Sequence, residues 1–369
     1  MIGEITYTRT PEGWSQTEFL RLGGFTVVFL NYNKDAFIER SVASALAQDF
    51  PLCEMFFMDD ASTDGSGDTM EKLVRAYTGR HKVTVVRNTV NQHITGQWNI
   101  VSRLATGNWL GMFCGDDVAC VDRVSRAAES ILKYPELRGW CSSAMELKPD
   151  ASVLHSVSVP DGENTEMRGD LTCSQFLAAG SAFGATAWWH KSNFEKSLPK
   201  GPLDDVILHW ILFCRNRGNK EVLFLWNRQV QTVGYSTSGG VSTTGTVRDE
   251  TKRFTFDSKV RERKYQHRIN GLFWRSMQGV LAYLRENRFP ENEIEQVAFI
   301  ARYRQVMAAG AFGRWLVLPG YLLKAIAHRS ESRDGHFIGN IMRTTIKEIF
   351  GVHLAAAIDV LQQLVLKSR

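Results

Sequence analysis

The sequence lacks several features that would assign it to a protein class at once. Residues 1–20 contain charged side chains and no apolar core, so no secretory signal is expected. The six cysteines form no Cys-x-x-Cys pair, which argues against a zinc site and favours buried free thiols in a reducing cytoplasm. Basic residues gather toward the end of the chain without a nucleic-acid-binding motif, so nucleic acid is not expected as a partner.

Charge is divided unevenly along the chain. Residues 1–251 contain 24 Lys and Arg against 29 Asp and Glu, whereas residues 252–369 contain 20 against 10. The net charge of +10 in the second part favours an anionic membrane surface or a phosphate-bearing lipid as a partner, and a solvated basic face is the alternative. Within this part Trp315–Leu323 is apolar but too short and broken to span a bilayer, and Ile346–Val365 has the apolar stripe of a helix.

A short apolar run followed by two acids stands at the centre of the first part. Met55–Met58 is uninterrupted, which is typical of a strand buried on both faces, and it ends in Asp59 and Asp60. A helical pattern follows, for which Ser62 and Thr63 offer capping hydroxyls. Open α/β sheets bind ligands at the carboxyl ends of their strands, although two such acids alone are equally typical of a turn.

A second pair of acids strengthens this interpretation. Trp109–Phe113 is another apolar run, and Asp116 and Asp117 follow it. Two strands that end in paired carboxylates concentrate negative charge at one sheet edge, which is costly without a cation or hydrogen-bond donors. No basic residue stands beside this pair in the sequence. The pattern therefore predicts a hard divalent cation held together with substrate phosphates.

At this point the chain resembles the inverting, family-2 nucleotide-sugar glycosyltransferases. Val27–Gly65 contains the family's strand, Tyr-Asn loop, helix, strand and Asp-Asp-x-Ser-x-Asp in that order, and the resemblance covers about residues 25–242. It implies the GT-A nucleotide-sugar-binding fold, an α/β fold in which helices flank a Rossmann-like mixed sheet.

The resemblance also implies a role for individual residues. Asp60 would bind the nucleobase, Asp116 the ribose side, and Asp117 with Asp116 the Mn²⁺ or Mg²⁺ on the diphosphate. A carboxylate accepts well from a nucleobase N–H or a ribose hydroxyl, and the ion neutralises the departing diphosphate. The full set of nucleotide-binding residues implied in this way is Asn31, Tyr32, Asn33, Asp59, Asp60, Gly96 and Asp116.

Three departures from the family's pattern accompany these matches. Cys114 stands where the family usually has the first acid of its metal motif, and Trp98 stands where it usually has an arginine. Gly234–Ser242 has no Arg or His at the place of the family's diphosphate-closing loop, where the amides of Gly239 and Gly240 could substitute.

A third pair of acids is expected to supply the general base. Asp204 and Asp205 open a predicted helix and resemble the family's Glu-Asp pair, in which the second acid takes the proton from the acceptor hydroxyl. A helix N-terminus lowers a carboxyl pKa, so burial must raise it for this task. Simple acidic capping is the alternative, and spacing alone does not choose between the two acids. The resemblance favours Asp205 as the base, with Asp204 beside it.

Gly184–Ser192 resembles the segment that lines the acceptor side of such enzymes. Trp188, Trp189 and His190 are therefore the acceptor-side candidates. Either indole could stack on a sugar ring, but alternation along a strand sends the two rings to opposite faces, so core packing is as well supported for one of them.

These observations combine into one expected organisation. Residues 1–24 form an N-terminal extension, residues 25–251 the GT-A domain, and residues 252–369 a basic, mainly helical appendage. The expected protein is a metal-dependent, hexosyltransferase-like enzyme that transfers a sugar from a nucleotide-diphosphate donor, with inversion, to a saccharide or lipid-linked acceptor. It would act in bacterial surface polysaccharide synthesis, in the cytoplasm or peripherally on the inner face of the cell membrane.

Two other functions are compatible with the same elements. A nucleotidyltransferase also combines paired acids, a metal and an α/β sheet, but its Gly-rich phosphate loop is missing from the polar segment that follows the first strand. A non-catalytic saccharide-binding protein would explain Cys114 at the place of an acid. The retained acids Asp60, Asp116, Asp117 and Asp205 argue against that function.

Overall fold

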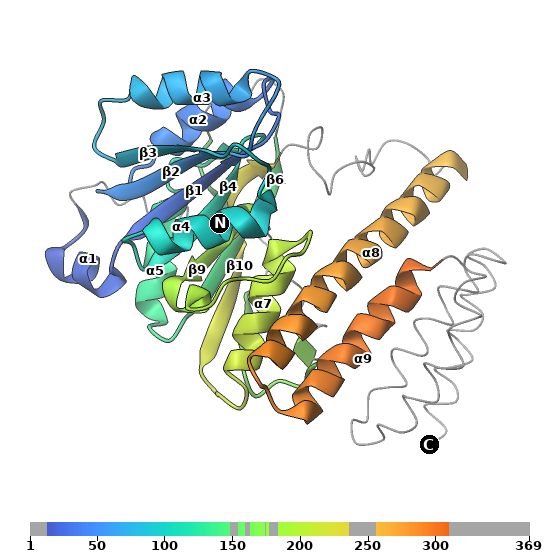
Figure 1. Cartoon of the computed structure of the whole chain (residues 1–369). Coiled ribbons are helices and arrows are strands. Elements are labelled where there is room, and N and C mark those ends of the chain that lie inside the picture. Colours follow the sequence, from blue (N-terminus) through green and yellow to red (C-terminus); the bar gives the residue numbers. More distant parts are fainter. Residues whose placement is uncertain are drawn as a thin grey trace. The chain divides into compact units, whose positions relative to one another are not determined.

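The computed structural model describes residues 13–147, 154–158, 163–173, 175–176, 184–235 and 256–309 (Figure 1). The chain divides into two compact units, Met1–Arg248 and Asp249–Arg369. In the part of the chain that the structure describes, no helix is both long and apolar enough to cross a membrane. The predictions for Trp315–Leu323 and Ile346–Val365, and for Gly234–Ser242 beyond residue 235, lie outside the described residues.

Four parallel strands form one half of the sheet in the first unit. They lie side by side in the order β3 (Lys82–Arg87), β2 (Cys53–Asp59), β1 (Phe25–Asn31) and β4 (Trp109–Cys114). Every residue of β1 and β2 is buried, as the uninterrupted apolar run of Met55–Met58 predicts for β2. Parallel strands in register bring their carboxyl ends to one edge of the sheet.

The other half of the sheet contains antiparallel pairs, so the sheet is mixed as predicted. Next to β4 come β9 (Trp188–His190), β6 (Gly139–Glu146), β10 (Val222–Tyr235) and β5 (Val118–Ala119), while β7 (Val157–Ser158) and β8 (Thr165–Arg168) also pair with β10. Strand β9 runs antiparallel to both of its neighbours, β4 and β6. Strand β10 is parallel to β6 and antiparallel to β5, β7 and β8.

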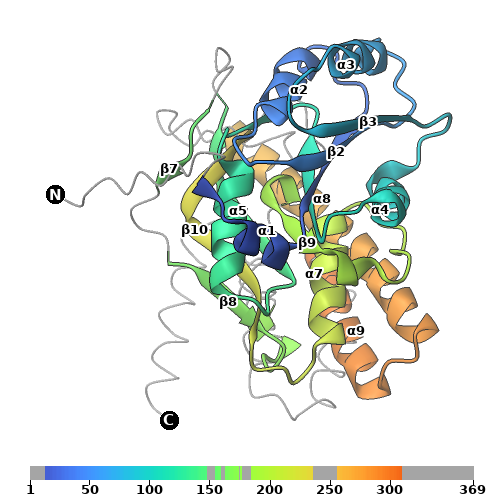
Figure 2. The same ribbon diagram turned by 90° about the vertical axis from the view of Figure 1, so that its left-hand side faces the viewer.

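Helices cover both faces of this sheet. They are α1 (Gln16–Leu22), α2 (Ile38–Leu46), α3 (Ser66–Arg75), α4 (His93–Leu104), α5 (Arg123–Lys133) and α7 (Asp204–Arg215), with short 3₁₀ turns η2 (Gly184–Thr186) and η3 (Lys191–Phe194). Helices α2 and α3 lie on one side of β1–β3 and α4 lies on the other, while α1 lies beside α5 (Figures 1 and 2). An apolar cluster of buried residues fills the face that α2 and α5 cover.

The start of α3 differs from the prediction. The helix begins at Ser66 after Gly65, whose φ of 89° is left-handed, so neither Ser62 nor Thr63 caps it. Instead, Ser62 Oγ accepts a hydrogen bond from the Asn33 amide at 3.0 Å. The Thr63 amide donates to the Asn33 side-chain oxygen at 2.8 Å. The two hydroxyl residues therefore tie the turn after β2 to the loop after β1.

All six cysteines are free thiols, and all but Cys114 are fully buried, which agrees with the prediction from their spacing.

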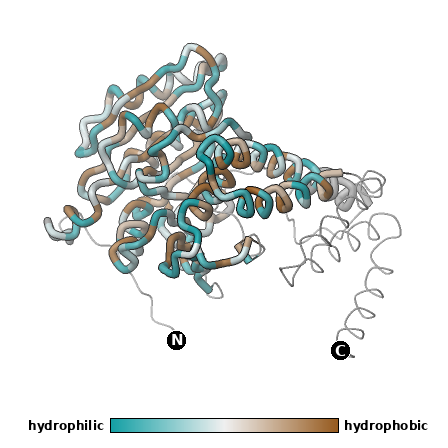
Figure 3. Tube along the Cα trace, turned by 60° about the horizontal axis from the view of Figure 1, so that its bottom comes forward, coloured by the Kyte–Doolittle hydropathy of each residue, from teal (hydrophilic) through white to brown (hydrophobic). Residues whose placement is uncertain are grey.

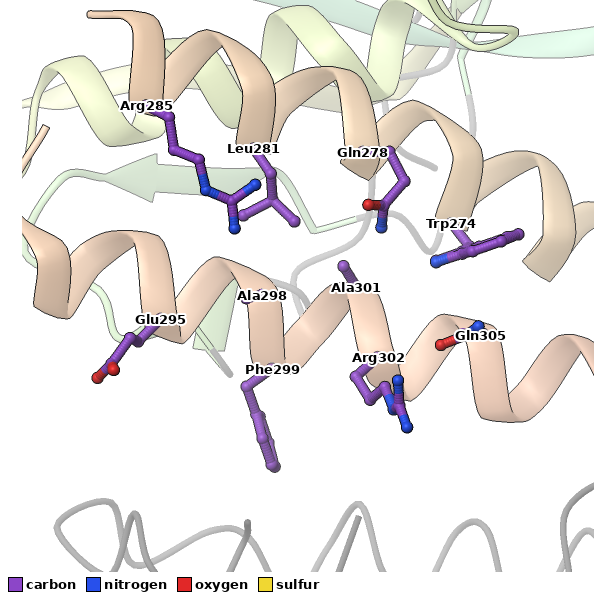
Figure 4. Close-up of a pocket in the computed structure, with 10 residues that line it drawn as sticks. All are labelled: Trp274, Gln278, Leu281, Arg285, Glu295, Ala298, Phe299, Ala301, Arg302 and Gln305. Atoms are coloured by element: carbon purple, nitrogen blue, oxygen red, sulfur yellow. The ribbon is translucent and has the colours of Figure 1, made fainter. Parts of the chain in front are cut away.

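In the second unit, α8 (Phe256–Glu286) and α9 (Glu291–Ala308) pack against each other, and both are helices, as expected for this part of the chain. Both hydrophobic and hydrophilic residues occur along these helices (Figure 3). Arg304 of α9 packs its guanidinium 4.2 Å from the ring centroid of Phe273 and donates to Asn270 Oδ1 at 2.9 Å. A groove between the helices is lined by aromatic, apolar and charged side chains, among them Trp274, Arg285 and Arg302 (Figure 4).

Candidate active site

The first two acidic pairs meet at one edge of the sheet. The register sets Asn31 beside Asp59 and Leu30 beside Cys114, so β2 and β4 end level with β1 on either side of it. The acids that follow these strands are therefore brought to one edge, as predicted.

The turn after β4 holds a compact group of candidate ligands. One atom from each of Cys114, Asp116 and Asp117 lies within 4.8 Å of the other two. The turn is fixed by a hydrogen bond from the Asp117 amide to the Cys114 carbonyl, 3.1 Å, and by one from Ser41 Oγ to the Asp117 carbonyl, 2.6 Å. Helix α2, which carries Ser41, thus holds the turn in place.

The chemistry of these donors fits a hard divalent cation. Burial, together with the charges of Asp117 and Asp116, raises the pKa of the Cys114 thiol well above its usual range. A protonated thiol is a poor metal ligand, which leaves two carboxylates as the donors. Mn²⁺ and Mg²⁺ prefer such oxygen ligands, so Asp116 and Asp117 are the residues that could hold the predicted ion.

Lys34 supplies a cation that the sequence prediction did not include. Its Nζ lies 2.6 Å from Asp116 Oδ2, and the Asp116 side chain is only 7% exposed. The pair therefore has a basic neighbour in space, although no basic residue stands beside it in the sequence. Lys34 is distant in sequence from Asp116, but it comes directly after Asn33 at the carboxyl end of β1, and that position was an available signal.

A second cation lies beneath the same turn. Arg123 is 1% exposed, and its guanidinium donates to the carbonyls of Met112, in β4, and Ala185, in η2. It also lies over the ring of Trp188, with 5.2 Å to the centroid. Arg123 therefore joins the strand that leads to the acidic turn to the segment that faces α7.

Asp59 is held entirely within the fold. Its side chain is 1% exposed, accepts from Asn31 Nδ2 at 2.8 Å and pairs with Arg87 Nε at 3.1 Å. It thereby joins β1, β2 and β3. Next to it in the loop after β1, Tyr32 is 47% exposed, and Asn33 has a left-handed φ of 53°. A nucleotide contact by any of these residues stays a prediction.

Asp60 closes the beginning of α4. Its carboxylate accepts from Asn88 Nδ2 at 3.0 Å and from the amides of Gln92 and His93 at 2.8 and 2.9 Å. A carboxylate accepts about four hydrogen bonds, so one position remains for a donor from a ligand. The residue with a left-handed backbone conformation at this helix start is His93, whose φ is 58°; Gly96 does not have a positive φ.

Gly96 lies within the first turns of α4. A Cβ atom at this position would lie 2.9 Å from the Cβ of Gln92, so packing inside the helix explains the glycine. Its predicted nucleotide contact is not tested by this placement.

The third acidic pair opens α7, and its two members have different surroundings. Asp204 is 4% exposed, and its Oδ2 accepts from the Trp98 indole Nε1 at 2.7 Å. Asp205 is half-buried, and its Oδ1 accepts from the Val206 amide at 2.9 Å. Trp98 and Asp204 are 106 residues apart, so no local pattern could have linked them.

Asp205 lies beside the segment that contacts β4. A Cβ atom on Gly184 would lie 3.2 Å from Met112 Cε and 3.5 Å from Asp205 Oδ2. The charge of Asp204 also contributes to the raised pKa of the Cys114 thiol, so the start of α7 is electrostatically coupled to the end of β4. The structure therefore brings the second and third acidic pairs to one region.

The same surroundings alter the proton affinity of the pair. Burial, and after it the charge of Asp204, raises the pKa of Asp205 to about 7. Burial also raises the pKa of Asp204, against the opposing effect of the Trp98 hydrogen bond. A carboxylate with a pKa near neutrality can both accept and release a proton at physiological pH.

The acceptor-side prediction needs correction for the two tryptophans. Trp188 and Trp189 are 0% and 1% exposed, so neither ring can stack on a sugar. As strand alternation predicts, they lie on opposite faces: Trp188 meets Phe25, and Trp189 meets Phe224. The burial of both rings is what the sequence did not reveal, because each face is covered by helices.

His190 is also displaced from the acidic edge. It pairs with Trp109, at the amino end of β4, whereas the acids follow the carboxyl end of that strand. Burial and the charge of Arg138 lower the pKa of His190 to about 4, so its ring is neutral at physiological pH. The antiparallel direction of β9 is the reason for this placement.

Comparison with known proteins bears on both the family and the fold. Residues 26–137 match the model of glycosyl transferase family 2, which confirms the resemblance for that segment. The putative glycosyltransferase EpsE of Bacillus subtilis (strain 168) is 27% identical over 109 residues, which are 30% of this chain and 38% of that protein. The match thus spans less than half of that relative.

Solved structures extend the likeness to most of the chain. S. aureus TarS 1–349 in complex with UDP-GlcNAc has a TM-score of 0.52 at 14% identity and covers 88% of this chain and 81% of its own. A second structure of TarS 1–349 has a TM-score of 0.50 at 12% identity and covers 89% of this chain and 81% of its own. The predicted GT-A fold is confirmed.

Proposed function

We propose that this chain is a glycosyltransferase that moves a sugar from a nucleotide-diphosphate donor to an acceptor hydroxyl with inversion at the anomeric carbon. The family match over residues 26–137 and the GT-A fold support the donor class. The observation that carries the proposal is Asp205, a half-buried carboxylate with a pKa of about 7 at the start of α7. It lies beside Gly184, which also adjoins Met112 of β4.

Asp205 is the proposed general base. A carboxylate on the side of the anomeric carbon opposite the leaving group takes the proton from the acceptor hydroxyl as the new bond forms. Burial provides the proton affinity that an exposed aspartate lacks. Asp204 is less suited to this role because its Oδ2 already accepts a hydrogen bond from Trp98.

The donor would bind along the carboxyl edge of β1, β2 and β4. Asp60 has one acceptor position left for a nucleobase N–H. Asp116 and Asp117 would hold Mn²⁺ or Mg²⁺, which when bound neutralises the charge that develops on the departing diphosphate. Lys34, 2.6 Å from Asp116, would place a further positive charge beside the same group.

The acceptor class is proposed from the family resemblance, and the membrane setting from the charge of the second part of the chain. A saccharide or a lipid-linked sugar, in bacterial surface polysaccharide synthesis, is the proposed acceptor. The +10 charge of residues 252–369 supports peripheral attachment to an anionic membrane surface. Exposed arginines of the α8–α9 groove, Arg285 and Arg302, would contribute to that attachment (Figure 4).

A binding screen tests the donor class. Nucleotide sugars that differ in base and sugar are titrated into the full chain by calorimetry, with Mn²⁺ and then with EDTA. We expect at least one to bind in Mn²⁺ and to lose most of its affinity in EDTA or in Asp117→Asn. Binding of none of them by folded protein would contradict the proposal.

A further inference from the structure

Trp98 stands apart from the rest of the proposed site because its role is not explained by packing alone. It is 0% exposed, and its ring stacks on Phe194 with centroids 5.2 Å apart and planes 23° apart. Its only polar atom donates to Asp204 Oδ2 at 2.7 Å. Helix α4 therefore contacts the acidic start of α7 through a neutral donor.

The hydrogen bond determines how Asp204 acts on its neighbour. A buried carboxylate is costly as an anion unless donors stabilise the charge, and Trp98 is the side-chain donor to Asp204. An anionic Asp204 disfavours a second negative charge on Asp205. The indole N–H thus acts on Asp205 through the charge of the acid between them.

Other titratable groups near the pair come from β4 and its turn. The Cys114 thiol lies within electrostatic reach of Asp204, and beyond it are Asp116, Asp117 and Lys34, which act on the same thiol. Asp204 and Asp205 are adjacent carboxylates, so a change of charge at one acid is expected to alter the pKa of the other.

We propose that Trp98 is a positioning residue which, through its hydrogen bond to Asp204, tunes the proton acceptor Asp205. The inference rests on the proposed function for the role of Asp205, but the coupling of the three side chains is a property of the fold. A neutral donor stabilises Asp204 without placing a full positive charge beside the base.

The variant Trp98→Phe tests the coupling because it keeps a ring against Phe194 and removes the donor. Asp204 should then take up a proton more readily, and a neutral Asp204 no longer disfavours the charge on Asp205. The pKa of Asp204 should rise by about one pH unit, as expected for loss of a hydrogen bond to a charged group, and the pKa of Asp205 should fall. The readout is ¹³C NMR of carboxyl-labelled aspartate in the full chain, with the Asp205 signal identified by its loss in Asp205→Asn.

Two further variants complete the design. Asp204→Asn should also lower the pKa of Asp205, because the asparagine side chain is neutral. Its amide oxygen still accepts the hydrogen bond from Trp98. Adding Trp98→Phe to Asp204→Asn should give no further shift. The matched control is Trp140→Phe, since Trp140 is 0% exposed and its Nε1 has no hydrogen-bond partner among the described residues.

Turnover links the coupling to the reaction. The acidic limb of the pH profile should move to lower pH in Trp98→Phe and Asp204→Asn and stay in place in Trp140→Phe. An unchanged Asp205 titration in both variants overturns the inference. Lower turnover at every pH with the limb in place would assign Trp98 to packing alone and also overturn it. Should Trp98→Phe not fold, the Asp204→Asn titration decides. A coupled titration without turnover of any nucleotide sugar would instead contradict the proposed function.

Discussion

Asp205 illustrates how one residue position sets both chemistry and stability. It begins α7 and is half-buried next to a second carboxylate, and these surroundings raise its pKa from 3.8 to about 7. The folded state therefore binds this proton more tightly than the unfolded chain does. Stability from this group is present below the unfolded pKa of 3.8 and is lost as the pH rises toward 7.

Asp205→Asn should remove the loss of stability that the charged Asp205 causes as the pH rises toward 7. We expect the variant to unfold at a higher temperature than the wild type at pH 8 and at nearly the same temperature below pH 4. A shift of about 2–4 °C per kcal/mol is expected for a domain of this size. Thermal unfolding followed by circular dichroism at both pH values measures it. An unchanged or lower midpoint at pH 8 would show that the ionised Asp205 side chain does not destabilise the folded protein.

Lys34 gives a second prediction for a single residue. Its ammonium group lies 2.6 Å from the nearly buried Asp116 and so occupies a position where a divalent cation would also be attracted. Lys34→Met keeps the aliphatic chain and removes the charge. We expect several-fold tighter Mn²⁺ binding to the nucleotide-free protein and several-fold weaker binding of nucleoside diphosphate, because the competitor for Asp116 and the phosphate partner are lost together.

Calorimetry measures both affinities for Lys34→Met. The control is Lys72→Met, since Lys72 is exposed on α3 and the structure gives it no contact with the acidic turn. Weaker Mn²⁺ binding in Lys34→Met would mean that the lysine organises the ligands and does not compete with the ion.

Among the elements, the buried strands were the most predictable from sequence. The apolar runs at Met55–Met58 and Trp109–Phe113 indicate β2 and β4 because a strand buried on both faces has few polar residues. Because β2 and β4 both pair in parallel with β1, their carboxyl ends lie at one edge of the sheet. The positions of the two acidic pairs that follow these strands could be predicted from this pairing alone. Helix α7 was predicted from a different signal, since apolar residues at helical spacing follow Asp204.

The parts of the site that sequence did not reveal depend on contacts between distant residues. The Trp98–Asp204 bond and the Lys34–Asp116 ion pair join different elements and leave no local pattern. The burial of Trp188 depends on the helices that cover the sheet.

Helix α4 provides a prediction at the same scale. Asp60 satisfies two amides at the beginning of α4 in addition to Asn88, while it is itself 2% exposed. Asp60→Asn leaves one acceptor oxygen for three donors. Stability should fall by about 1–3 kcal/mol, the cost of a buried donor left unsatisfied, and amides near His93 should exchange faster with solvent.

Denaturant unfolding and hydrogen exchange read these two effects of Asp60→Asn. Asp68→Asn is the matched control, because the Asp68 side chain is 84% exposed and its ion pair with Arg87 is at the surface, where such pairs contribute little. Equal losses of stability in Asp60→Asn and Asp68→Asn would contradict the role of Asp60 in stabilising the start of α4.

For the whole molecule, the uneven charge suggests a division of labour. Residues 252–369 carry +10, and each basic residue near an anionic surface contributes about 1 kcal/mol to attachment. Anionic vesicles should retain the full chain at low salt and release it at high salt.

Changing Arg285 and Arg302 together to Gln should weaken retention about tenfold or more. The same change at Lys133, on the exposed surface of α5, should have little effect. Retention that is insensitive to salt would contradict this account.

The most direct test of the central claim measures the release of nucleoside diphosphate from the nucleotide sugar that binds best. The wild type should release it in Mn²⁺, and EDTA should abolish the release. Asp205→Asn should bind the donor normally and release product roughly 10²–10⁴ times more slowly, as expected when a general base is lost, while Asp204→Asn is affected much less. Full activity in EDTA, or an Asp205→Asn variant as active as the wild type, would contradict the account.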